Sequence, residues 1–333
     1  MHDCLYCYAR DAVYSRKKEG AMLIYSDLAS TVEKELTRLE LCPPVSISNA
    51  TDPCQDVPEL RQAVKDLVGV LVTWGVSFHV ITKGDPSFLA EVDGFPGRGH
   101  FFLAVTIEGP PEVLGMLSPR APSYEKRLAS LRWASSLGLP ALVRLDPVVP
   151  PLWRSLYGED WEEAASLVVA DCAAAGAGHV VSSTGRFTAA TRGALQGLVR
   201  DGGGSKGDGM EECYVYDRSY TSSGYMLRRG LRLDFHRRMR DVAREHGMTY
   251  AVCQELSAEE ADTPVLPHCE AFPMPFSRRV GTREFAPLAG CTANCHVACA
   301  GLDDPPCGRP ELALPQPFRP SSLKMPRQAS PSK

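Results

Sequence analysis

The sequence predicts an α/β protein in which six strand-helix units form a partial (β/α)6 barrel, followed by a cysteine-rich C-terminal extension. Short apolar, β-branched runs alternate with longer segments of helical period, as in a parallel sheet with helices outside it. The six units fill about 250 residues, and they are fewer than a closed eight-stranded barrel needs. Periodicity alone leaves a doubly wound sheet open as the alternative.

The expected elements alternate along the chain. Apolar runs predict strands at 45–48, 78–82, 101–107, 141–145, 179–182 and 249–253. Apolar residues at three- and four-residue spacing predict helices at 26–39, 58–74, 123–137, 161–175 and 234–245. Ser26 and Ser123 stand where a side chain can cap the first turn of a helix.

Composition narrows the class of protein. The chain has 333 residues, 44% of them hydrophobic, which suffices for one large domain with an appendage. It has no run of about 18 apolar residues and no signal-peptide pattern at Met1, so we expect a cytoplasmic protein that does not span a membrane. The formal net charge of −4 excludes a surface that is basic throughout, and nucleic acid would have to bind a local patch.

Twelve cysteines are many for a reducing compartment, where metal or redox chemistry explains them better than disulfides. Cys4 and Cys7 stand at the start of the chain. Four more crowd a short stretch near the end, namely Cys291, Cys295, Cys299 and Cys307. The other six are scattered without metal-ligand spacing, and we expect most of them to be small buried residues.

Polar segments follow four of the expected strands, at 48–53, 82–85, 106–108 and 144–147. Active sites of parallel α/β folds form at these carboxyl ends. The glycine-rich segment 201–209 follows no strand and lacks the spacing of a phosphate loop, so we expect a flexible connection there.

The segment Cys4-Leu5-Tyr6-Cys7-Tyr8-Ala9-Arg10 is the most informative. A lone C-x2-C pair is weak evidence, because zinc sites and redox pairs also use it. Here the neighbouring residues match the second half of the C-x3-C-x2-C loop of radical S-adenosylmethionine enzymes. Five further segments occur in the order seen in spore photoproduct lyase-like proteins, often labelled DNA repair photolyases: SNATDP, ITK, VTIE, LSPRAPSYEKRL and VRLDPVVP. Residues 1–260 therefore resemble that group.

The resemblance implies a partial TIM-like barrel of the radical S-adenosylmethionine type. It implies an enzyme with a 4Fe-4S cluster that cleaves S-adenosylmethionine reductively to a 5′-deoxyadenosyl radical, with ferredoxin or flavodoxin as electron donor. Lyase-like chemistry on a nucleic acid or on a protein would follow. Cys4 and Cys7 would ligate the cluster, with Tyr6 and Tyr8 beside it. Seven residues would serve the cofactor: Thr51, Asp52, Lys83, Thr106, Arg120, Arg144 and Asp146.

Plainer interpretations of these polar residues stay open. Asp52, Lys83 and Thr106 could cap loops or face solvent. Arg120 could anchor the start of a helix, and Arg144 could form a structural ion pair with Asp146.

The pattern departs from the group at two places. A third thiolate requires a cysteine four positions before Cys4, which falls immediately before Met1, and the first barrel strand is missing as well. We therefore expect Met1 to be internal to a longer reading frame with a Cys codon before it, and the chain as written to load its cluster poorly. Spore photoproduct lyase returns a hydrogen atom from a cysteine near the Thr-Asp pair, but here the nearest thiol is Cys54, a displaced donor or a buried packing residue.

The four C-terminal cysteines fit a second iron-sulfur cluster or a tetrahedral zinc site. Free thiols, or a set completed by Cys269, are the alternative. The expected organisation is a radical S-adenosylmethionine core at 1–260, a metal-binding extension at 261–311 and a disordered tail rich in Pro, Ser and basic residues at 312–333.

Seven arginines lie between Arg228 and Arg244, after a group of tyrosines. They predict either a solvated helix face or a nucleic-acid surface. The rival to an enzyme is a catalytically inactive iron-sulfur or zinc protein that retains the barrel and serves an interaction. The sequence does not name the substrate.

Overall fold

The structure is a computed structural model that describes residues 2–7, 22–47, 50–203, 209–218, 224–257, 259–260, 262, 266, 268–314 and 320–325.

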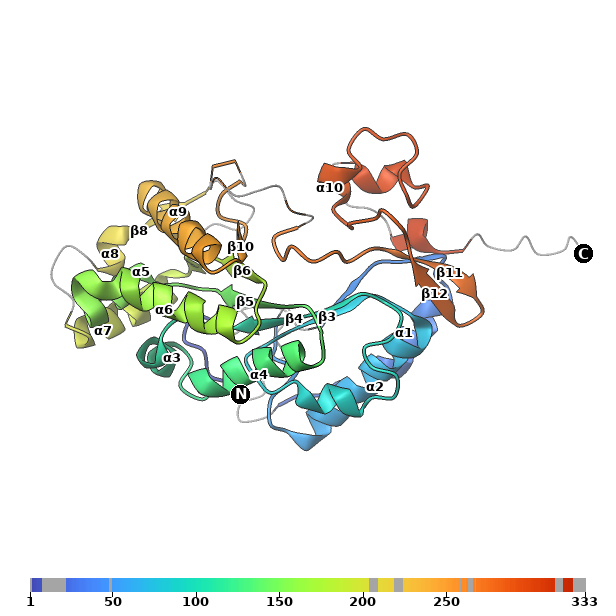
Figure 1. Cartoon of the computed structure of the whole chain (residues 1–333), viewed down its shortest axis with the longest axis horizontal. Coiled ribbons are helices and arrows are strands. Elements are labelled where there is room, and N and C mark those ends of the chain that lie inside the picture. The colour runs from blue at the N-terminus through green and yellow to red at the C-terminus, as the bar shows by residue number, and fades with distance from the viewer. Residues whose placement is uncertain are drawn as a thin grey trace, which may run out of the picture.

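A parallel sheet of six strands forms the centre of the molecule (Figure 1). Its order is β10-β6-β5-β4-β3-β2, and each neighbouring pair is parallel. The strands are β2 (Val45–Ile47), β3 (Phe78–Thr82), β4 (Phe101–Thr106), β5 (Ala141–Leu145), β6 (His179–Ser182) and β10 (Thr249–Val252). Each predicted strand is confirmed to within one residue.

The strand order decides between the two predicted architectures. The strands of this sheet lie side by side in the order in which they follow one another along the chain. The chain therefore proceeds across the sheet in one direction, as it does in a (β/α) barrel. A doubly wound sheet would reverse direction at a switch point. Because β2 and β10 are the two edges of the sheet, the barrel is open. The predicted fold class, a partial (β/α)6 barrel, is confirmed.

Helices cover the outer face of the sheet (Figure 1). Alternate strand residues such as Phe78, Leu103 and Val143 point into this core, where they pack with helical residues including Trp74 and Leu131. The helices that follow the strands are α2 (Pro58–Trp74), α3 (Pro111–Leu117), α4 (Tyr124–Ser136), α5 (Pro150–Tyr157), α6 (Trp161–Ala174), α7 (Ala189–Asp201), α8 (Met210–Cys213) and α9 (Arg229–Glu245). The helix α1 (Leu28–Leu36) precedes β2.

The helix boundaries correct three predictions. Asp27, not Ser26, is the N-cap position of α1, because the helix begins later than the periodicity suggested. Ser123 does precede α4, but its side chain makes no capping hydrogen bond. The helix α9 begins at Arg229 rather than at residue 234, and the buried face of its first turns carries Arg232, a charged residue that an apolar period does not count.

Two small antiparallel sheets join residues that periodicity did not connect. One has the order β7-β9-β8 and contains β7 (Arg186–Phe187), β8 (Tyr214–Asp217) and β9 (Gly224–Leu227). The other has the order β1-β11-β12 and contains β1 (Leu41–Cys42), β11 (Ser277–Gly281) and β12 (Glu284–Pro287). In the second sheet, Leu41 pairs with Arg278, which ties the C-terminal extension to the start of the barrel.

The chain after β10 crosses the inner face of the sheet before it reaches β11 (Figure 1). Phe272 packs on Phe102 of β4 with ring centroids 5.6 Å apart, and Met274 joins the same buried cluster. The carbonyl of Cys269 lies 2.8 Å from Nε2 of His179. The crossing segment thus closes part of the open barrel.

The described parts of the C-terminal region are packed. Leu312 and Leu323, which the sequence analysis placed in the tail, are buried beside Leu41 and Phe276. Short helical turns hold them, at Pro310–Ala313 and Pro320–Leu323, after the four-residue helix α10 (Cys295–Ala298). Within the described ranges, no helix has the length and apolar character that crossing a membrane requires.

Candidate active site

The loop with Cys4 and Cys7 lies against the segment that follows β4 and α3. The Leu5 amide donates to the carbonyl of Leu117 at 2.9 Å, and the Arg120 amide donates to the carbonyl of His2 at 3.3 Å. Both thiols are half-buried. Burial raises the pKa of Cys4, and the ammonium of Lys83 opposes that rise in pKa. The loop is therefore held at the carboxyl edge of the sheet.

A fully buried carboxylate, Glu108, anchors this loop. It accepts a hydrogen bond from the Tyr6 hydroxyl, pairs with the Arg127 guanidinium, and lies 3.6 Å from Lys83 Nζ. Burial alone would raise the pKa of Glu108, but Arg127 and Lys83 outweigh it and hold that pKa below its ordinary value. Glu108 therefore stays ionised and fixes both Tyr6 and Lys83.

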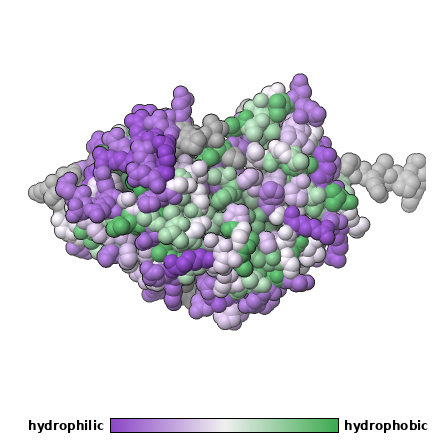
Figure 2. All heavy atoms as spheres, in the orientation of Figure 1, coloured by the Kyte–Doolittle hydropathy of each residue, from purple (hydrophilic) through white to green (hydrophobic). Residues whose placement is uncertain are grey.

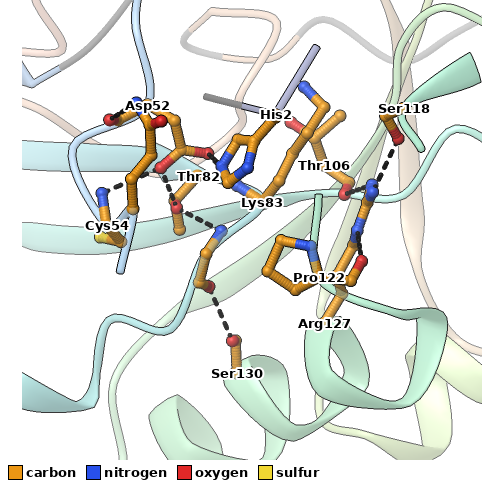
Figure 3. A network of polar contacts seen from close by, with 12 residues as sticks. His2, Asp52, Cys54, Thr82, Lys83, Thr106, Ser118, Pro122, Arg127 and Ser130 are labelled. Atoms are coloured by element: carbon orange, nitrogen blue, oxygen red, sulfur yellow. Dashed lines mark hydrogen bonds and ion pairs between the residues drawn. The ribbon is translucent and has the colours of Figure 1, made fainter. Parts of the chain in front are cut away.

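Arg127 on α4 ties three segments together (Figure 3). Its guanidinium donates to the carbonyl of Thr106 at 2.9 Å, to that of Pro122 at 2.9 Å and to Ser118 Oγ at 2.8 Å. Thr106 ends β4, while Ser118 and Pro122 lie between α3 and α4. A buried guanidinium needs such partners, because an unsatisfied polar group in the interior is costly.

Asp52 organises a second polar group beside the first (Figure 3). It accepts from Thr82 Oγ1 at 2.6 Å and from the backbone amide of Lys83 at 2.6 Å, and His2 Nε2 lies 3.0 Å away. Burial alone would raise the pKa of Asp52, but the hydrogen bonds and His2 lower it overall. The carboxylate thus joins the end of β3 to the chain start.

Arg144 and Asp146 lie one strand further along the sheet. Arg144 contacts Asp146 at 2.8 Å and Glu270 of the crossing segment at 3.1 Å, and its Nη2 lies 3.8 Å from Cys253 Sγ. Side-chain hydrogen bonding with Cys269 is the main cause that lowers the pKa of Cys253, and Arg144 adds to it against the effect of burial. The ion pair that the sequence analysis left as an alternative is present, with Glu270 as a third member.

The inner face carries polar atoms that the described residues do not satisfy. His79 Nδ1 and His268 Nε2 are buried and have no hydrogen-bond partner there. His79 stacks on Phe102 at 4.6 Å, and burial is the main cause that lowers its pKa to about 4. A polar ligand on this face would meet groups able to bind it.

The structure thus brings together Cys4, Tyr6, Asp52, Lys83 and Thr106, around Glu108 and Arg127. Other predicted site residues stand apart from this group. Thr51 is exposed, and Arg120 is exposed with its Nε 3.9 Å from Asp3. Cys54 is 1% exposed within the helix-side core, and burial is the main cause that raises its pKa. Tyr8 lies outside the described residues.

Sequence reasoning missed Glu108, Arg127, His2 and Glu270. The first two stand within segments that carried the resemblance, VTIE and SYEKRL, so the signal was present without an assigned role. His2 and Glu270 had no such signal, because only the tertiary structure brings them to Asp52 and Arg144.

The arginine-rich segment forms a paired, solvated surface on α9. Arg237 lies 2.9 Å from Asp262 and Arg240 lies 2.8 Å from Asp241, while Arg232 is buried 3.6 Å from Asp217. Figure 2 shows this part of the surface as strongly hydrophilic. The pairing favours the solvated-face interpretation over a free basic patch.

The chain has the fold of spore photoproduct lyase. One solved structure, a mutant of that enzyme with bound AdoMet and dinucleoside spore photoproduct, has a TM-score of 0.56 and 16% identity, and the match covers 75% of this chain and 72% of that one. The enzyme complexed with dinucleoside spore photoproduct gives a TM-score of 0.54 at 16% identity, and another mutant gives 0.53 at 18%, both with the same coverage. No family model matches the chain, and no curated protein does.

Proposed function

We propose that the chain is a radical S-adenosylmethionine enzyme with lyase-like chemistry on a nucleic acid. One observation carries the proposal: the Cys4 and Cys7 loop is held at the carboxyl edge of an open (β/α) barrel by Glu108 and Lys83. The shared fold with an AdoMet-bound lyase supports the same assignment.

Cys4 and Cys7 would hold a 4Fe-4S cluster through two of its irons. When bound, such a cluster supplies the electron that cleaves S-adenosylmethionine to a 5′-deoxyadenosyl radical, with ferredoxin or flavodoxin as the proposed electron donor. The chain's own residues position this chemistry. Tyr6 stands between Cys4 and Cys7 in the sequence, and its hydroxyl donates a hydrogen bond to Glu108. This hydrogen bond would hold the cysteine loop in one conformation.

The neighbouring strand ends would bind S-adenosylmethionine. Lys83 follows β3 and Thr106 ends β4. The Lys83 ammonium lies 5.6 Å from the centroid of the Tyr6 ring in the cysteine loop, and Asp52 accepts a hydrogen bond from the backbone amide of Lys83. Arg144 lies on the next strand end, where a guanidinium suits a carboxylate. The unsatisfied nitrogens of His79 and His268 make the inner face receptive to a polar substrate.

An exposed aromatic surface supports nucleic acid as the substrate class. Tyr216 on β8 is 51% exposed and lies 5.4 Å from the Tyr225 ring on β9, and Arg192 stacks over Tyr225 at 3.9 Å. Bases stack on such side chains with little sequence preference. The chain enters the separate sheet β7-β9-β8 at β7, shortly after the carboxyl end of β6. The cysteine loop is held at the same carboxyl edge of the central sheet.

Anaerobic reconstitution with iron and sulfide tests the proposal. Iron content is measured first, and the cluster-loaded protein is then given dithionite and S-adenosylmethionine. We expect release of 5′-deoxyadenosine that requires the reductant. Cluster-loaded, full-length protein that binds S-adenosylmethionine but releases none would favour the inactive interaction protein instead.

A further inference from the structure

The β8-β9 hairpin carries the proposed stacking surface, but it belongs to a sheet that is separate from the barrel. Tyr214 and Tyr216 stand two residues apart on β8, so their side chains share one face of the hairpin. Tyr214 is fully buried, whereas Tyr216 is 51% exposed. This aromatic face therefore has a buried end at Tyr214 and an open end at Tyr216.

The aromatic face continues across the small sheet. Phe187 on β7 pairs with Tyr225 on β9, and Tyr225 pairs in turn with Tyr216 on β8. Residues directly opposite one another on neighbouring strands have their side chains on the same face. The Phe187 ring also packs on the Tyr214 ring, with centroids 5.3 Å apart. Because the exposed rings are continuous with the buried ones, a displacement of Tyr214 would displace the stacking surface as well.

Tyr214 joins this face to the barrel. Its hydroxyl donates a hydrogen bond to the carbonyl of Thr184 at 2.6 Å, and both residues are fully buried. Thr184 follows β6 at the carboxyl edge of the central sheet. A buried hydroxyl without an acceptor would be costly, so the Tyr214 ring is stable only where its oxygen reaches this carbonyl. The hydrogen bond therefore fixes one end of the aromatic face to the edge of the barrel.

Thr184 is itself held by the ends of neighbouring strands. Its amide and its hydroxyl donate to the carboxylate of Glu255, which follows β10, at 2.9 and 2.8 Å. The Ser183 hydroxyl donates to the same carboxylate at 2.8 Å. The Ser183 carbonyl accepts from the amide of Val148 at 2.8 Å, in the segment after β5 that contains Asp146. The acceptor of the Tyr214 hydroxyl is thus fixed to three strands of the central sheet.

A second contact attaches the hairpin to a different part of the molecule. Arg232 on α9 is buried, its Nη2 lies 3.6 Å from Asp217 Oδ2, and its Nη1 lies 3.5 Å from Met226 Sδ. This contact holds the hairpin to a helix outside the sheet. The Tyr214 hydrogen bond instead connects the hairpin to the carboxyl edge, where the proposed cofactor site lies.

We propose that Tyr214 is a positioning residue that, through Thr184, holds the stacking rings of Tyr216 and Tyr225 in one place relative to the carboxyl edge of the barrel. The inference rests on the proposed nucleic-acid substrate. Without the hydrogen bond, the hairpin would occupy several positions, and only some of them would let a nucleic acid contact the rings and the edge together. The apparent affinity falls in proportion to the fraction of molecules in the competent position.

Tyr214→Phe tests the hydrogen bond, because it removes the hydroxyl and keeps the ring. Hydrogen exchange followed by mass spectrometry should show faster exchange in β8 and β9 and unchanged exchange in β4 and β5. The control Tyr124→Phe removes a hydroxyl that donates to Asp171 at 2.8 Å between α4 and α6, and it should leave exchange in the hairpin at the parent rate. Unchanged hairpin exchange in Tyr214→Phe would overturn the proposal.

Binding of a short oligothymidine separates positioning from a general loss of stability. Fluorescence anisotropy at fixed salt should show roughly twofold to tenfold weaker binding by Tyr214→Phe, the equivalent of one hydrogen bond, and parent affinity for Tyr124→Phe. Parent affinity in Tyr214→Phe would overturn the proposal. A parent protein that binds no oligothymidine would contradict the nucleic-acid substrate of the proposed function, and hairpin exchange would then decide the role of Tyr214 by itself.

Discussion

At the scale of single residues, the site rests on Glu108 and Arg127, which lie wholly inside the protein. The sequence identified the segments that contain them, but it assigned the cofactor role to their neighbour Thr106. The predicted strand ends indicate which residues share an edge of the sheet. They do not indicate that Glu108 and Arg127 are buried and paired, because that depends on how α4 packs over the edge. Cys4, Cys7, Asp52 and Lys83 stand within recognisable motifs, so the sequence could place them at one edge of the sheet, and their roles in binding a cluster or cofactor stay predictions.

Glu108→Gln should destabilise the fold by roughly 3–5 kcal/mol, because it leaves the buried Arg127 without its counter-charge. Urea unfolding measures the change. The control Glu125→Gln removes an exposed partner of Arg132 and should cost at most about 1 kcal/mol. Equal effects of the two substitutions would show that the buried pair contributes no more to stability than the exposed pair.

Glu255 gives the fold an acid-sensitive component. It is buried, accepts from Thr184 Oγ1 at 2.8 Å and lies 3.1 Å from His236 Nε2. Burial alone would raise its pKa, but His236 and the hydrogen bonds from Thr184 and Ser183 hold the pKa below its ordinary value. Because the pKa of Glu255 is lower in the folded protein than in the unfolded chain, its ionised form stabilises the fold. This contribution is present above the unfolded-state pKa of about 4.3 and is lost as the pH falls through the pKa of the folded state.

Glu255→Gln should therefore reduce the free energy of unfolding at neutral pH by about 1–3 kcal/mol and flatten its decline in acid. Urea unfolding between neutral and acidic pH measures both. Glu163→Gln, on the exposed side of α6, is the control and should leave the acid limb unchanged. An unchanged acid limb in the Glu255 variant would contradict the assignment.

At the scale of elements, the sequence predicted the central strands well because each is a short apolar run between breakers. It missed the sheets β7-β9-β8 and β1-β11-β12, since their strands are short and partly exposed. Their third strands, β7 and β1, pair with residues far away in sequence. The crossing segment was equally invisible. Met274 is buried and Phe272 is partly buried on the inner face, and neither belongs to a periodic apolar pattern.

The loop after β3 depends on a glycine. A Cβ on Gly84 would lie 2.0 Å from the carbonyl oxygen of Cys54 and 2.9 Å from its Cβ. Gly84→Ala should therefore displace Lys83 and Asp52 and cost about 1–3 kcal/mol. Gly115→Ala on α3, with nothing within 4 Å, is the control and should stabilise slightly. Thermal unfolding compares them, and two equal shifts in melting temperature would exclude the close contact.

The hairpin β8-β9 carries the proposed stacking surface. Tyr216→Ala should weaken binding of a short oligothymidine by about 1–3 kcal/mol, since it removes one base-stacking partner. Fluorescence anisotropy at fixed salt gives the affinity. Leu167→Ala on α6 deletes an equally exposed side chain, 59% exposed, and should leave the affinity unchanged. Indistinguishable affinities for the two variants would remove this surface from the substrate path.

At the scale of the whole molecule, an open barrel presents one edge of parallel strand ends, and the chain start, β3, β4 and α4 converge there. The order of motifs along the sequence was sufficient to predict this architecture, because consecutive β/α units place consecutive strand ends side by side. The C-terminal region was predicted only as a cysteine-rich, metal-binding extension followed by a disordered tail. Its attachment to β1 and its passage across the inner face follow from packing that no local pattern encodes.

The most direct measurement is dithionite-dependent release of 5′-deoxyadenosine by the reconstituted protein and by two cysteine variants. The account predicts that Cys7→Ala loses both the N-terminal iron and all deoxyadenosine, while Cys172→Ala, which changes a buried core thiol, keeps both. A Cys7→Ala protein that releases deoxyadenosine at the parent rate would contradict the assignment of the cysteine loop, and with it the proposed activity.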